Sequence, residues 1–495
     1  MEQIINKNNK EYAEKCFKEA IELGLNFKLD NKVNEKHFNI DMLNDLMKIP
    51  MDELGNEKVI EEFKEKILPY CTNFSSEKFM GFPDAGNSIS GITGAIISDF
   101  MQQNLINSSF CAPIATFVEI AVIKWLREII GYNTPEIKNI WDVGGIITYG
   151  GTGSNVTAML LARENFNNNT MINGVDNPKN YKIIIPKGIG HYSIRSASMW
   201  IGCGDNIIEV DTKDFKYDLD KLKMALEQNK GKVMSVVAYA GDSRTMTIDN
   251  LKEIYELVKS IDSNIWLHVD ACHGFSLAFS EKLKYKVKDL KLFDSISIDP
   301  HKVLAVPYCI SALLVKNPEK MKLITSTSDL IMQEEFSYGQ ITPFIGSKSW
   351  VSLKLWFAIK SFGIKKYGTL IEKRCEMAKY LQDKIINSNE FVVLNDVSIN
   401  SVVFMYVGNK DKLNNVNIEN LNRLNLLIYN KLLEEGEYYV HKFTIPDNKG
   451  IIKKDAILVP LRYMSGNDNI TEKNIDDLLE HIKKVVKEIK NESYM

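Results

Sequence analysis

The sequence lacks the features that would mark a membrane or exported protein. No apolar run approaches the roughly 18–20 residues that a helix needs to cross a bilayer. The first residues, Met1 to Lys7, show no apolar core behind a basic start, so we expect no signal peptide. Internal repeats and low-complexity linkers are also missing. These absences are typical of a soluble globular protein, and we expect no membrane partner.

Cysteine is scarce, and its spacing indicates no cluster. The seven cysteines are odd in number and scattered, and no two of them form a CxxC pair. This spacing argues against a zinc site and against a disulfide framework. We therefore expect no metal, and we expect reduced thiols in a cytoplasmic protein.

No excess of either charge is present. The 61 Lys and Arg residues nearly balance the 64 Asp and Glu residues, for a net charge of -3, and the two kinds are mixed along the chain. Nucleic-acid binding usually requires a basic excess or patch, so we expect no such partner. A hydrophobic content of 45% fits a globular protein, and 495 residues suggest two or three domains.

Three regions differ in their pattern of apolar residues. Residues 1–75 read as helices without strands, which need another part of the molecule or a second subunit to pack on. Residues 76–345 alternate short β-rich runs with helical stretches, which predicts an α/β domain with a mostly parallel sheet covered on both faces. Residues 346–495 start with a helical run at 352–381 and predict a small α+β C-terminal domain. The expected strands are 182–186, 206–210, 233–240, 264–269, 295–298 and 309–315, then 401–407 and 456–459.

A glycine-rich segment lies ahead of the first of these runs, at a position where we expect another strand to end. Tyr149 to Asn155 reads Tyr-Gly-Gly-Thr-Gly-Ser-Asn and precedes a helical stretch. Glycines allow backbone N–H groups to approach an anion, and a helix N-terminus adds partial positive charge. The segment is therefore either a phosphate cradle or simply a tight strand-to-helix turn. A dinucleotide site is disfavoured because the spacing is not GxGxxG.

Two further polar residues follow buried strands, and ligands of parallel sheets bind at such strand ends. Asp270 closes the run 265–269, where it needs a cationic or strongly donating partner, or else caps the next turn. Lys302 follows the run 295–298. Burial would lower its pKa and make the amine nucleophilic, as Schiff-base chemistry requires. The alternative for Lys302 is a lysine that snorkels at the edge of the sheet.

Together these motifs resemble the group II decarboxylases that depend on pyridoxal 5'-phosphate, a family that includes aromatic amino-acid, glutamate and tyrosine decarboxylases, with sphingosine-phosphate lyases as close relatives. The resemblance runs from about Phe79 to the last helix. It rests on the glycine-rich segment, His191, the run 268–274 (His-Val-Asp-Ala-Cys-His-Gly) and the run 299–302 (Asp-Pro-His-Lys). It implies fold type I, the aspartate aminotransferase-like α/β fold, and pyridoxal 5'-phosphate as the cofactor.

The resemblance also implies a role for each matching residue. Lys302 would form the Schiff base with the cofactor, and Asp270 would hold the pyridine N–H. His191 would stack on one face of the ring and Cys272 on the other, whereas His268 would pack within the sheet. The phosphate would be bound by Thr152, Gly153 and Ser154, with help from Asp299 or His301. The segment 81–88 resembles the substrate-side loop of the family, which would place Pro83, Asp84 and Ala85 at the substrate.

Three departures from the family pattern bear on the reaction. The mobile-loop tyrosine that serves as the Cα acid is missing, and Tyr338 is the only tyrosine nearby that could replace it. Loss of that acid is associated in the family with oxidative chemistry that yields aldehydes. Asp242 stands where the family more often has Thr, and it would form a local ion pair with Arg244. Lys348 replaces an arginine, which weakens the case for a phosphorylated or acidic substrate.

We therefore expect an enzyme that decarboxylates a neutral, and by preference aromatic, L-amino acid to the amine and carbon dioxide. Two alternatives are a carbon–carbon lyase of the sphingosine-phosphate type and oxidative decarboxylation to an aldehyde. A binding protein without turnover is disfavoured because Lys302, Asp270 and His191 are all retained. The resemblance further implies a homodimer in which residues 1–75 wrap the partner subunit and the active sites lie at the interface.

Overall fold

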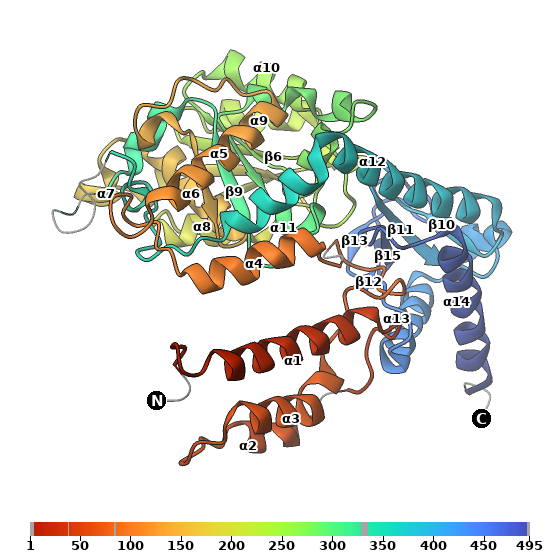
Figure 1. Cartoon of the computed structure of the whole chain (residues 1–495). Helices are drawn as coiled ribbons and strands as arrows, with labels where there is room; N and C mark the ends of the chain where they lie inside the picture. The colour runs from red at the N-terminus through yellow and green to blue at the C-terminus, as the bar shows by residue number, and fades with distance from the viewer. Residues whose placement is uncertain (1–3, 38, 84–85, 327, 329–334, 493–495) are drawn as a thin grey trace.

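The structure is a computed structural model that describes residues 4–37, 39–83, 86–326, 328 and 335–492. It contains an α/β domain with the largest hydrophobic core, a C-terminal domain with a core of its own, and a group of N-terminal helices beside them (Figure 1). Within these described ranges no helix combines the length and apolarity needed to span a membrane.

The α/β domain is built on a seven-stranded sheet in the order β1-β9-β8-β7-β6-β2-β3. Strands β8, β7, β6, β2 and β3 are parallel, whereas β9 runs antiparallel to both of its neighbours, β1 and β8. The predicted mostly parallel sheet is thus confirmed. Every residue of the central strands β6, β7 and β8 is buried, as expected when helices cover both faces. The bounds are β1 (Gly145–Thr148), β2 (Lys182–Pro186), β3 (Ile207–Val210), β6 (Val233–Tyr239), β7 (Trp266–Asp270), β8 (Ser295–Ile298) and β9 (Ser311–Val315).

Helices lie on both faces of this sheet because right-handed crossovers place them there. The chain moves from β1 to β2 and β3 through α6 (Gly151–Phe166) and α8 (Tyr192–Trp200), which pack on each other. It returns through α9 (Leu219–Gln228) and α10 (Leu251–Ile261), which pack together on the opposite face. The other elements of the domain are α4 (Ile89–Met101), α5 (Pro113–Ile130), α7 (Thr170–Asn173), α11 (Pro300–Val303), β4 (Thr212–Lys213) and β5 (Lys216–Tyr217).

The long helix α12 (Ser352–Asn387) links the two domains. It contacts α4 and α5 of the α/β domain and then β10 and β11 of the C-terminal domain. Gly363, with a φ of 68°, breaks its regular geometry partway along. The C-terminal sheet is antiparallel in the order β10-β11-β15-β12. The elements are β10 (Phe391–Val393), β11 (Ser401–Tyr406), α13 (Ile418–Glu435), β12 (His441–Lys442), β13 (Ile445–Pro446), β14 (Ile457–Leu458), β15 (Leu461–Met464) and α14 (Glu472–Glu492).

The N-terminal helices α1 (Lys10–Leu29), α2 (Leu43–Leu46) and α3 (Asn56–Lys66) lie below the α/β domain in Figure 1 and largely outside it. Lys64 of α3 forms a 2.7 Å ion pair with Glu19 of α1. Cys16 is the buried residue of α1, whereas its larger apolar side chains are mostly exposed. The prediction of strand-free helices in this region is consistent with these elements.

A buried ion pair joins three segments of the α/β domain. Lys348 Nζ lies 2.9 Å from Glu119 Oε1 of α5 and donates to the backbone oxygen of Ile147 of β1 at 3.1 Å. Both charged side chains are fully buried. Lys348 is therefore enclosed in the protein interior, where removal of one charge would leave the other without compensation.

We expect Glu119→Gln to destabilise the protein by about 3–5 kcal/mol, because the Lys348 ammonium would remain buried opposite a neutral amide. The midpoint of urea unfolding measures this loss. The matched control is the double variant Glu119→Leu with Lys348→Met, which removes both charges and should recover most of the lost stability. A single variant at least as stable as the double variant would contradict this account of the pair.

Candidate active site

A cavity of about 190 Å³ lies at the carboxyl ends of β6, β7 and β8, where a parallel sheet is expected to bind its ligand. It brings together residues that are far apart in the sequence. Its walls are formed by Gly150, Gly151, Thr152, Asn155, His191, Tyr192, Tyr239, Gly241, Ser243, Asp270, Cys272, His273, Asp299, His301, Lys302, Tyr308 and Cys309. Seven of the nine predicted cofactor residues are among them: Thr152, His191, Asp270, Cys272, Asp299, His301 and Lys302.

Lys302 enters the cavity from the short helix α11, directly after β8. Its Nζ lies 2.7 Å from Asp299 Oδ2, and Asp299 also accepts a hydrogen bond from Ser311. Burial would lower the pKa of Lys302, but the Asp299 carboxylate outweighs it and raises that pKa above its ordinary value. The expectation that burial alone leaves this amine deprotonated is therefore wrong, since the neighbouring carboxylate holds it as an ammonium.

Asp299 is the anionic partner of Lys302. Burial would raise the pKa of Asp299, but Lys302 and His301 outweigh it and set the pKa at about 2. An ionised carboxylate has no hydrogen to donate to a phosphate oxygen. The expected help of Asp299 in phosphate binding thus has no support in this geometry. The ring of His301 faces Tyr308 at 4.9 Å, and its Nδ1 lies 2.7 Å from the backbone oxygen of Ile310.

Asp270 is the last residue of β7 and is 6% exposed. Its Oδ2 accepts a hydrogen bond from Asn155 Nδ2 at 3.0 Å, and its Oδ1 accepts one from the backbone N–H of Cys272 at 3.2 Å. Both acceptor oxygens are thus fixed in direction at the floor of the cavity.

His191 and Cys272 also line the cavity. His191 is the N-cap of α8, and its backbone N–H donates to Tyr239 Oη at 2.8 Å. Burial lowers the pKa of His191 although Asp270 opposes the shift, so the imidazole is neutral near pH 7. Burial, and secondarily Asp270, raises the pKa of the Cys272 thiol well above its ordinary value, so Cys272 is an uncharged packing surface.

The glycine-rich segment forms the turn between β1 and α6. Gly150 has a φ of 90°, and α6 begins at Gly151. A Cβ atom on Gly151 would lie 2.9 Å from Asp299 Oδ2 and from Cys272 Sγ, so only glycine fits there. The first N–H groups of a helix point along its axis and have no helical acceptor, and Gly151 and Thr152, the first two residues of α6, both line the cavity. Gly151 and Thr152 are therefore suited to hold an anion.

Gly153 and Ser154 lie outside this cavity. Ser154 is fully buried, and its Oγ lies 2.6 Å from Thr148 Oγ1. The backbone N–H groups of Gly153 and Ser154 point back to the oxygen of Gly150 at 3.0 and 3.4 Å. Their expected role at the phosphate therefore has no support in this geometry, because the turn directs both residues elsewhere.

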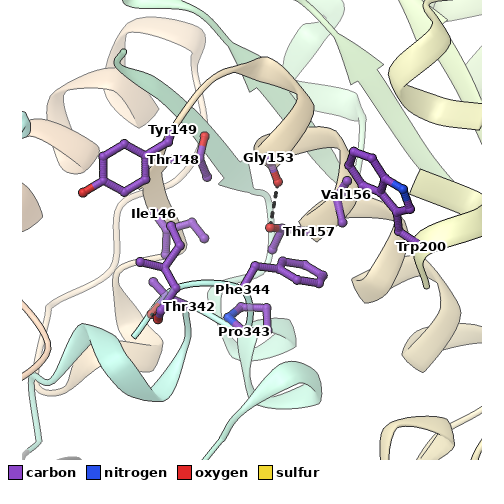
Figure 2. Close-up of a pocket in the computed structure, with 11 residues that line it drawn as sticks. Ile146, Thr148, Tyr149, Gly153, Val156, Thr157, Trp200, Thr342, Pro343 and Phe344 are labelled. Atoms are coloured by element: carbon purple, nitrogen blue, oxygen red, sulfur yellow. Dashed lines mark hydrogen bonds between the residues drawn. The ribbon is translucent and has the colours of Figure 1, made fainter. Parts of the chain in front are cut away.

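Gly153 lines a second cavity, of about 450 Å³, on the other side of the same turn (Figure 2). Thr157 donates to the Gly153 backbone oxygen there at 2.9 Å, and Trp200 and Phe344 face the space from opposite sides. Tyr149 is the only titratable residue among its lining residues. This larger cavity lacks the amine and carboxylates of the smaller one, so the chemistry belongs to the smaller cavity.

Tyr338 is not brought to Lys302 within this chain. It is fully buried, and its ring lies 5.5 Å from Lys348 Nζ. Burial, with a contribution from Glu119, raises its pKa well above the ordinary value. It does not line the cavity, and a proton-donating role at Cα has no geometric support here. The burial of Lys348 likewise removes it from any direct role in choosing the substrate.

The other predicted residues lie at the edge of the site. Pro83 packs near Gly466 and does not line the cavity, whereas Asp84 and Ala85 lie outside the described residues. The neighbouring segment is held by Arg462 of β15, which donates to the Gly81 backbone oxygen at 3.0 Å and to that of Ser243. The C-terminal domain thus contacts the margin of the site.

The expected ion pair between Asp242 and Arg244 is wrong. Asp242 is fully buried and accepts hydrogen bonds from the backbone N–H groups of Arg244, Thr245 and Thr247, each at 2.8 Å. The guanidinium of Arg244 instead donates to the backbone oxygen of Gly188. Asp242 therefore caps the turn after β6, and its hydrogen-bonding role is local.

The lining residues that sequence reasoning missed include Asn155, Tyr239, His273 and Tyr308. Asn155 belongs to the glycine-rich segment but received no role. Its position just after the turn that begins a helix indicates that its side-chain amide lies near the site. Tyr239 is the last residue of β6, a strand end of the same kind as Asp270. His273 lies within the run 268–274, and Tyr308 follows the run 299–302. Among the described residues, none forms a hydrogen bond with the buried His273 Nε2.

Comparison with known proteins agrees with this geometry. Residues 41–407 match the pyridoxal-dependent decarboxylase conserved domain. The chain belongs to the pyridoxal-dependent decarboxylase family. It is thus a carboxy-lyase of the family whose cofactor is pyridoxal 5'-phosphate, and the recognition made from the motifs is confirmed.

Individual relatives are distant. The chain is 23% identical over 388 residues to the aromatic-L-amino-acid decarboxylase of Bacillus atrophaeus, which covers 74% of this chain and 76% of that protein. It is 27% identical to the L-2,4-diaminobutyrate decarboxylase of Acinetobacter baumannii over 66% of each chain. It is 23% identical to the phenylacetaldehyde synthase of Petunia hybrida, over 78% of this chain and 77% of that one.

Solved structures show the same fold. Catharanthus roseus tryptophan decarboxylase in complex with L-tryptophan superposes with a TM-score of 0.82 at 18% identity, covering 98% of this chain and 99% of that one. Oryza sativa TDC with PLP and tryptamine superposes with a TM-score of 0.86 at 18% identity, covering 98% and 100%. This pyridoxal-dependent decarboxylase therefore has fold type I, as expected.

The cavity of this decarboxylase fits its cofactor. One wall offers the N-terminus of α6 to an anion, and the Cβ-free surface of Gly151 leaves room for close approach. A carboxylate, Asp270, stands on the floor, where it can accept from a protonated pyridine nitrogen. The amine of Lys302 lies in the same cavity. These are the three contacts that the phosphate, ring nitrogen and aldehyde of the cofactor require.

We expect Asp299→Asn to make Lys302 more reactive in the cofactor-free protein, because loss of the carboxylate lets burial lower the pKa of the amine. Each unit by which that pKa falls raises the free-amine fraction about tenfold. The rate at which cyanate modifies Lys302 at pH 8, followed by mass spectrometry, should rise at least tenfold. Exposed Lys282 serves as the internal control, and an unchanged rate at Lys302 would refute the proposed pairing.

Proposed function

We propose that this enzyme removes the α-carboxylate of a neutral, preferentially aromatic, L-amino acid and releases the amine and carbon dioxide, with Lys302 as the residue that bonds to the cofactor. The observation that carries the proposal is the placement of the Lys302 amine and the Asp270 carboxylate in one cavity. The similarity to an aromatic-L-amino-acid decarboxylase supports the choice of substrate.

Each residue has a defined task in this proposal. When bound, pyridoxal 5'-phosphate supplies an electron sink for the bonding pair that the departing carboxylate leaves behind. Asp270 keeps a proton on the pyridine nitrogen, and the first turn of α6 holds the phosphate. His191 and Cys272 pack against the two ring faces. Lys302 would hold the cofactor through its amine before the substrate binds and after the product amine is released.

Oxidative decarboxylation to an aldehyde is a second candidate. It is favoured by the position of Tyr338, which does not reach the cavity in this chain, and by the similarity to a phenylacetaldehyde synthase. The carbon–carbon lyase alternative has less support. The segment Gly346-Ser347-Lys348 resembles that of the lyases, but Lys348 is buried against Glu119.

We also propose a homodimer of cytoplasmic subunits in which the N-terminal helices contact the partner. The side chains of Phe17, Ile21 and Leu25 of α1 are 40%, 48% and 52% exposed. An exposed apolar surface of this kind marks a site of contact with another protein. The exposed side chains of Trp200 and Phe344 beside the larger cavity could also be covered by a second subunit. All seven cysteines lie among the described residues and are unpaired, as expected for a reducing compartment.

Lys302→Ala should abolish both the yellow colour of the purified protein and the release of carbon dioxide, because no amine would remain to bond the cofactor. The wild-type enzyme should release carbon dioxide from at least one amino acid in a panel of tryptophan, tyrosine, phenylalanine, glutamate, aspartate and 2,4-diaminobutyrate. Lys282→Ala, at a side chain that is 75% exposed, is the matched control and should keep both properties.

Product analysis in the same assay separates the candidates. Amine supports decarboxylation, whereas aldehyde with hydrogen peroxide and ammonia, formed with consumption of dioxygen and water, supports the oxidative reaction. Colour and turnover retained in Lys302→Ala would overturn the assignment of Lys302. Turnover of only acidic amino acids or 2,4-diaminobutyrate would overturn the proposed substrate class.

Removal of residues 1–70 should yield monomeric or insoluble protein, because the deletion exposes the surface that the N-terminal helices and a partner would cover. Sedimentation velocity of the full chain and of the truncated chain measures this. A truncated protein that stays soluble, dimeric and fully active would count against the proposed role of these helices.

A further inference from the structure

A single buried amide connects the floor of the active-site cavity to its wall. Asn155 lies near the start of α6 and is 1% exposed. Its Nδ2 lies 3.0 Å from Asp270 Oδ2 and 2.8 Å from Ser193 Oγ, and its Oδ1 lies 3.0 Å from His268 Nε2. All of its side-chain polar atoms are thus engaged with residues of two other elements, β7 and α8.

The orientation of this amide follows from its partners. If the oxygen and nitrogen of Asn155 exchanged places, the amide oxygen would face the carboxylate of Asp270 at hydrogen-bond distance, and two acceptors would repel each other. With the nitrogen toward Asp270, both amide hydrogens have acceptors. The oxygen then requires a hydrogen on His268 Nε2.

The protonation state of His268 is fixed in the same way. Burial lowers the pKa of His268 to about 4, so the ring is neutral near pH 7 and carries one hydrogen. That hydrogen is on Nε2, so Nδ1 must accept, and it lies 2.8 Å from Ser295 Oγ. Ser295 in turn accepts from Trp266 Nε1, which can only donate, at 2.8 Å. The hydrogen bonds therefore run in one direction from Trp266 to Asp270.

A second branch reaches His191. Ser193 Oγ accepts from Asn155, so its own hydrogen is available to His191 Nδ1 at 2.6 Å. The backbone N–H of Ser193 also points to this nitrogen at 3.3 Å. Nδ1 of His191 is therefore an acceptor, and the neutral ring carries its hydrogen on Nε2.

We propose that Asn155 is a positioning residue that holds the Asp270 carboxylate in place beneath the pyridine nitrogen and sets the tautomer of His191 at the ring face. The proposal rests on the proposed roles of Asp270 and His191 toward the cofactor. It gives His268, which was expected only to pack within the sheet, a task as the group that orients the amide. Removal of the amide hydrogen would weaken the interaction between Asp270 and the pyridinium and leave the phosphate site unchanged.

The decisive variant is Asn155→Asp, which keeps the shape and the acceptor for His268 but places a second oxygen beside the Asp270 carboxylate. At low pH the new carboxyl group is protonated and can still donate to Asp270. As the pH rises it loses that proton, and a second negative charge then stands where an amide hydrogen had bound the Asp270 carboxylate. The other titratable groups that face Asp270 are His191, Tyr239, His268, Cys272 and Lys302.

The measurement is the dissociation constant of pyridoxal 5'-phosphate, determined by fluorescence quenching of the cofactor-free protein between pH 5.5 and 8.5. The ratio of the dissociation constants of Asn155→Asp and wild type should lie below about three at pH 5.5 and exceed ten at pH 8.5. A role in packing alone would give a ratio that does not change with pH. A ratio that is flat, or within threefold throughout, would overturn the proposal.

Two controls keep the result interpretable. Asn425→Asp alters another fully buried amide, which donates to the backbone oxygens of Tyr406 and Leu421 in the C-terminal domain. It should lower the thermal midpoint without changing cofactor affinity. Ser193→Ala removes only the hydrogen bond to His191. The dissociation constant of this variant should therefore stay within threefold of the wild-type value at every pH, and a larger change would contradict the assigned hydrogen bonds.

Nuclear magnetic resonance tests the network without cofactor or turnover. In protein labelled with ¹⁵N-histidine, seven rings are present, and His268→Gln and Ser193→Ala assign the two of interest. Both His268 and His191 should show the Nε2–H tautomer from pH 7 to 8.5, and His191 should become a mixture of tautomers in Ser193→Ala. An Nδ1–H tautomer at His268 would refute the direction of the chain.

These readouts separate the present inference from the proposed function. If the wild-type enzyme releases no carbon dioxide from any amino acid but the ratio of dissociation constants still depends on pH, the hydrogen-bond network is supported and the proposed reaction is refuted. If the enzyme is an active decarboxylase but the ratio of dissociation constants does not change with pH, the proposed reaction is supported and the role of Asn155 is refuted.

Discussion

The site depends on a negative charge that is buried at the end of a strand. Asp270 closes β7 with 6% of its surface exposed, and a carboxylate in that position is costly unless donors surround it. Asn155 and the backbone of Cys272 supply two of those donors, and the cofactor nitrogen would supply the third. The strand β7, the helix α6 after the glycine-rich turn and His191 are all arranged about this one charge. Fold and chemistry are therefore linked through the same carboxylate.

Much of this arrangement could be predicted from the sequence. Parallel strands gather their carboxyl ends at one edge of the sheet, so Lys302, Asp270 and the glycine-rich turn had to converge once the alternation of strands and helices was recognised. The sheet itself followed from apolar runs separated by helical stretches. His191 could be placed only through the family resemblance, because the segment around it has no periodicity of its own.

Other features could not be predicted, for physical reasons. A local motif does not show which way the side chains of a helical turn point, and Ser154 turns inward to Thr148 while Thr152 faces the cavity. Nor does it show the partner of a charge that lies far away in the sequence: Lys348 meets Glu119 across more than two hundred residues. Asp299 was three residues from Lys302, yet its effect on the amine depends on the orientation of both side chains in α11.

The pairing of Lys302 with Asp299 has a consequence for the protein before it meets its cofactor. An amine held as an ammonium is a poor nucleophile, so sugars and other metabolites that carry a free carbonyl find little to react with in the cavity. A molecule gains access to the amine only if it brings enough binding energy, at the helix terminus and at the buried acid, to disturb the pair. The amine of the newly made chain is therefore unreactive toward most carbonyl compounds, and only a ligand that is both anionic and aromatic makes it available for reaction.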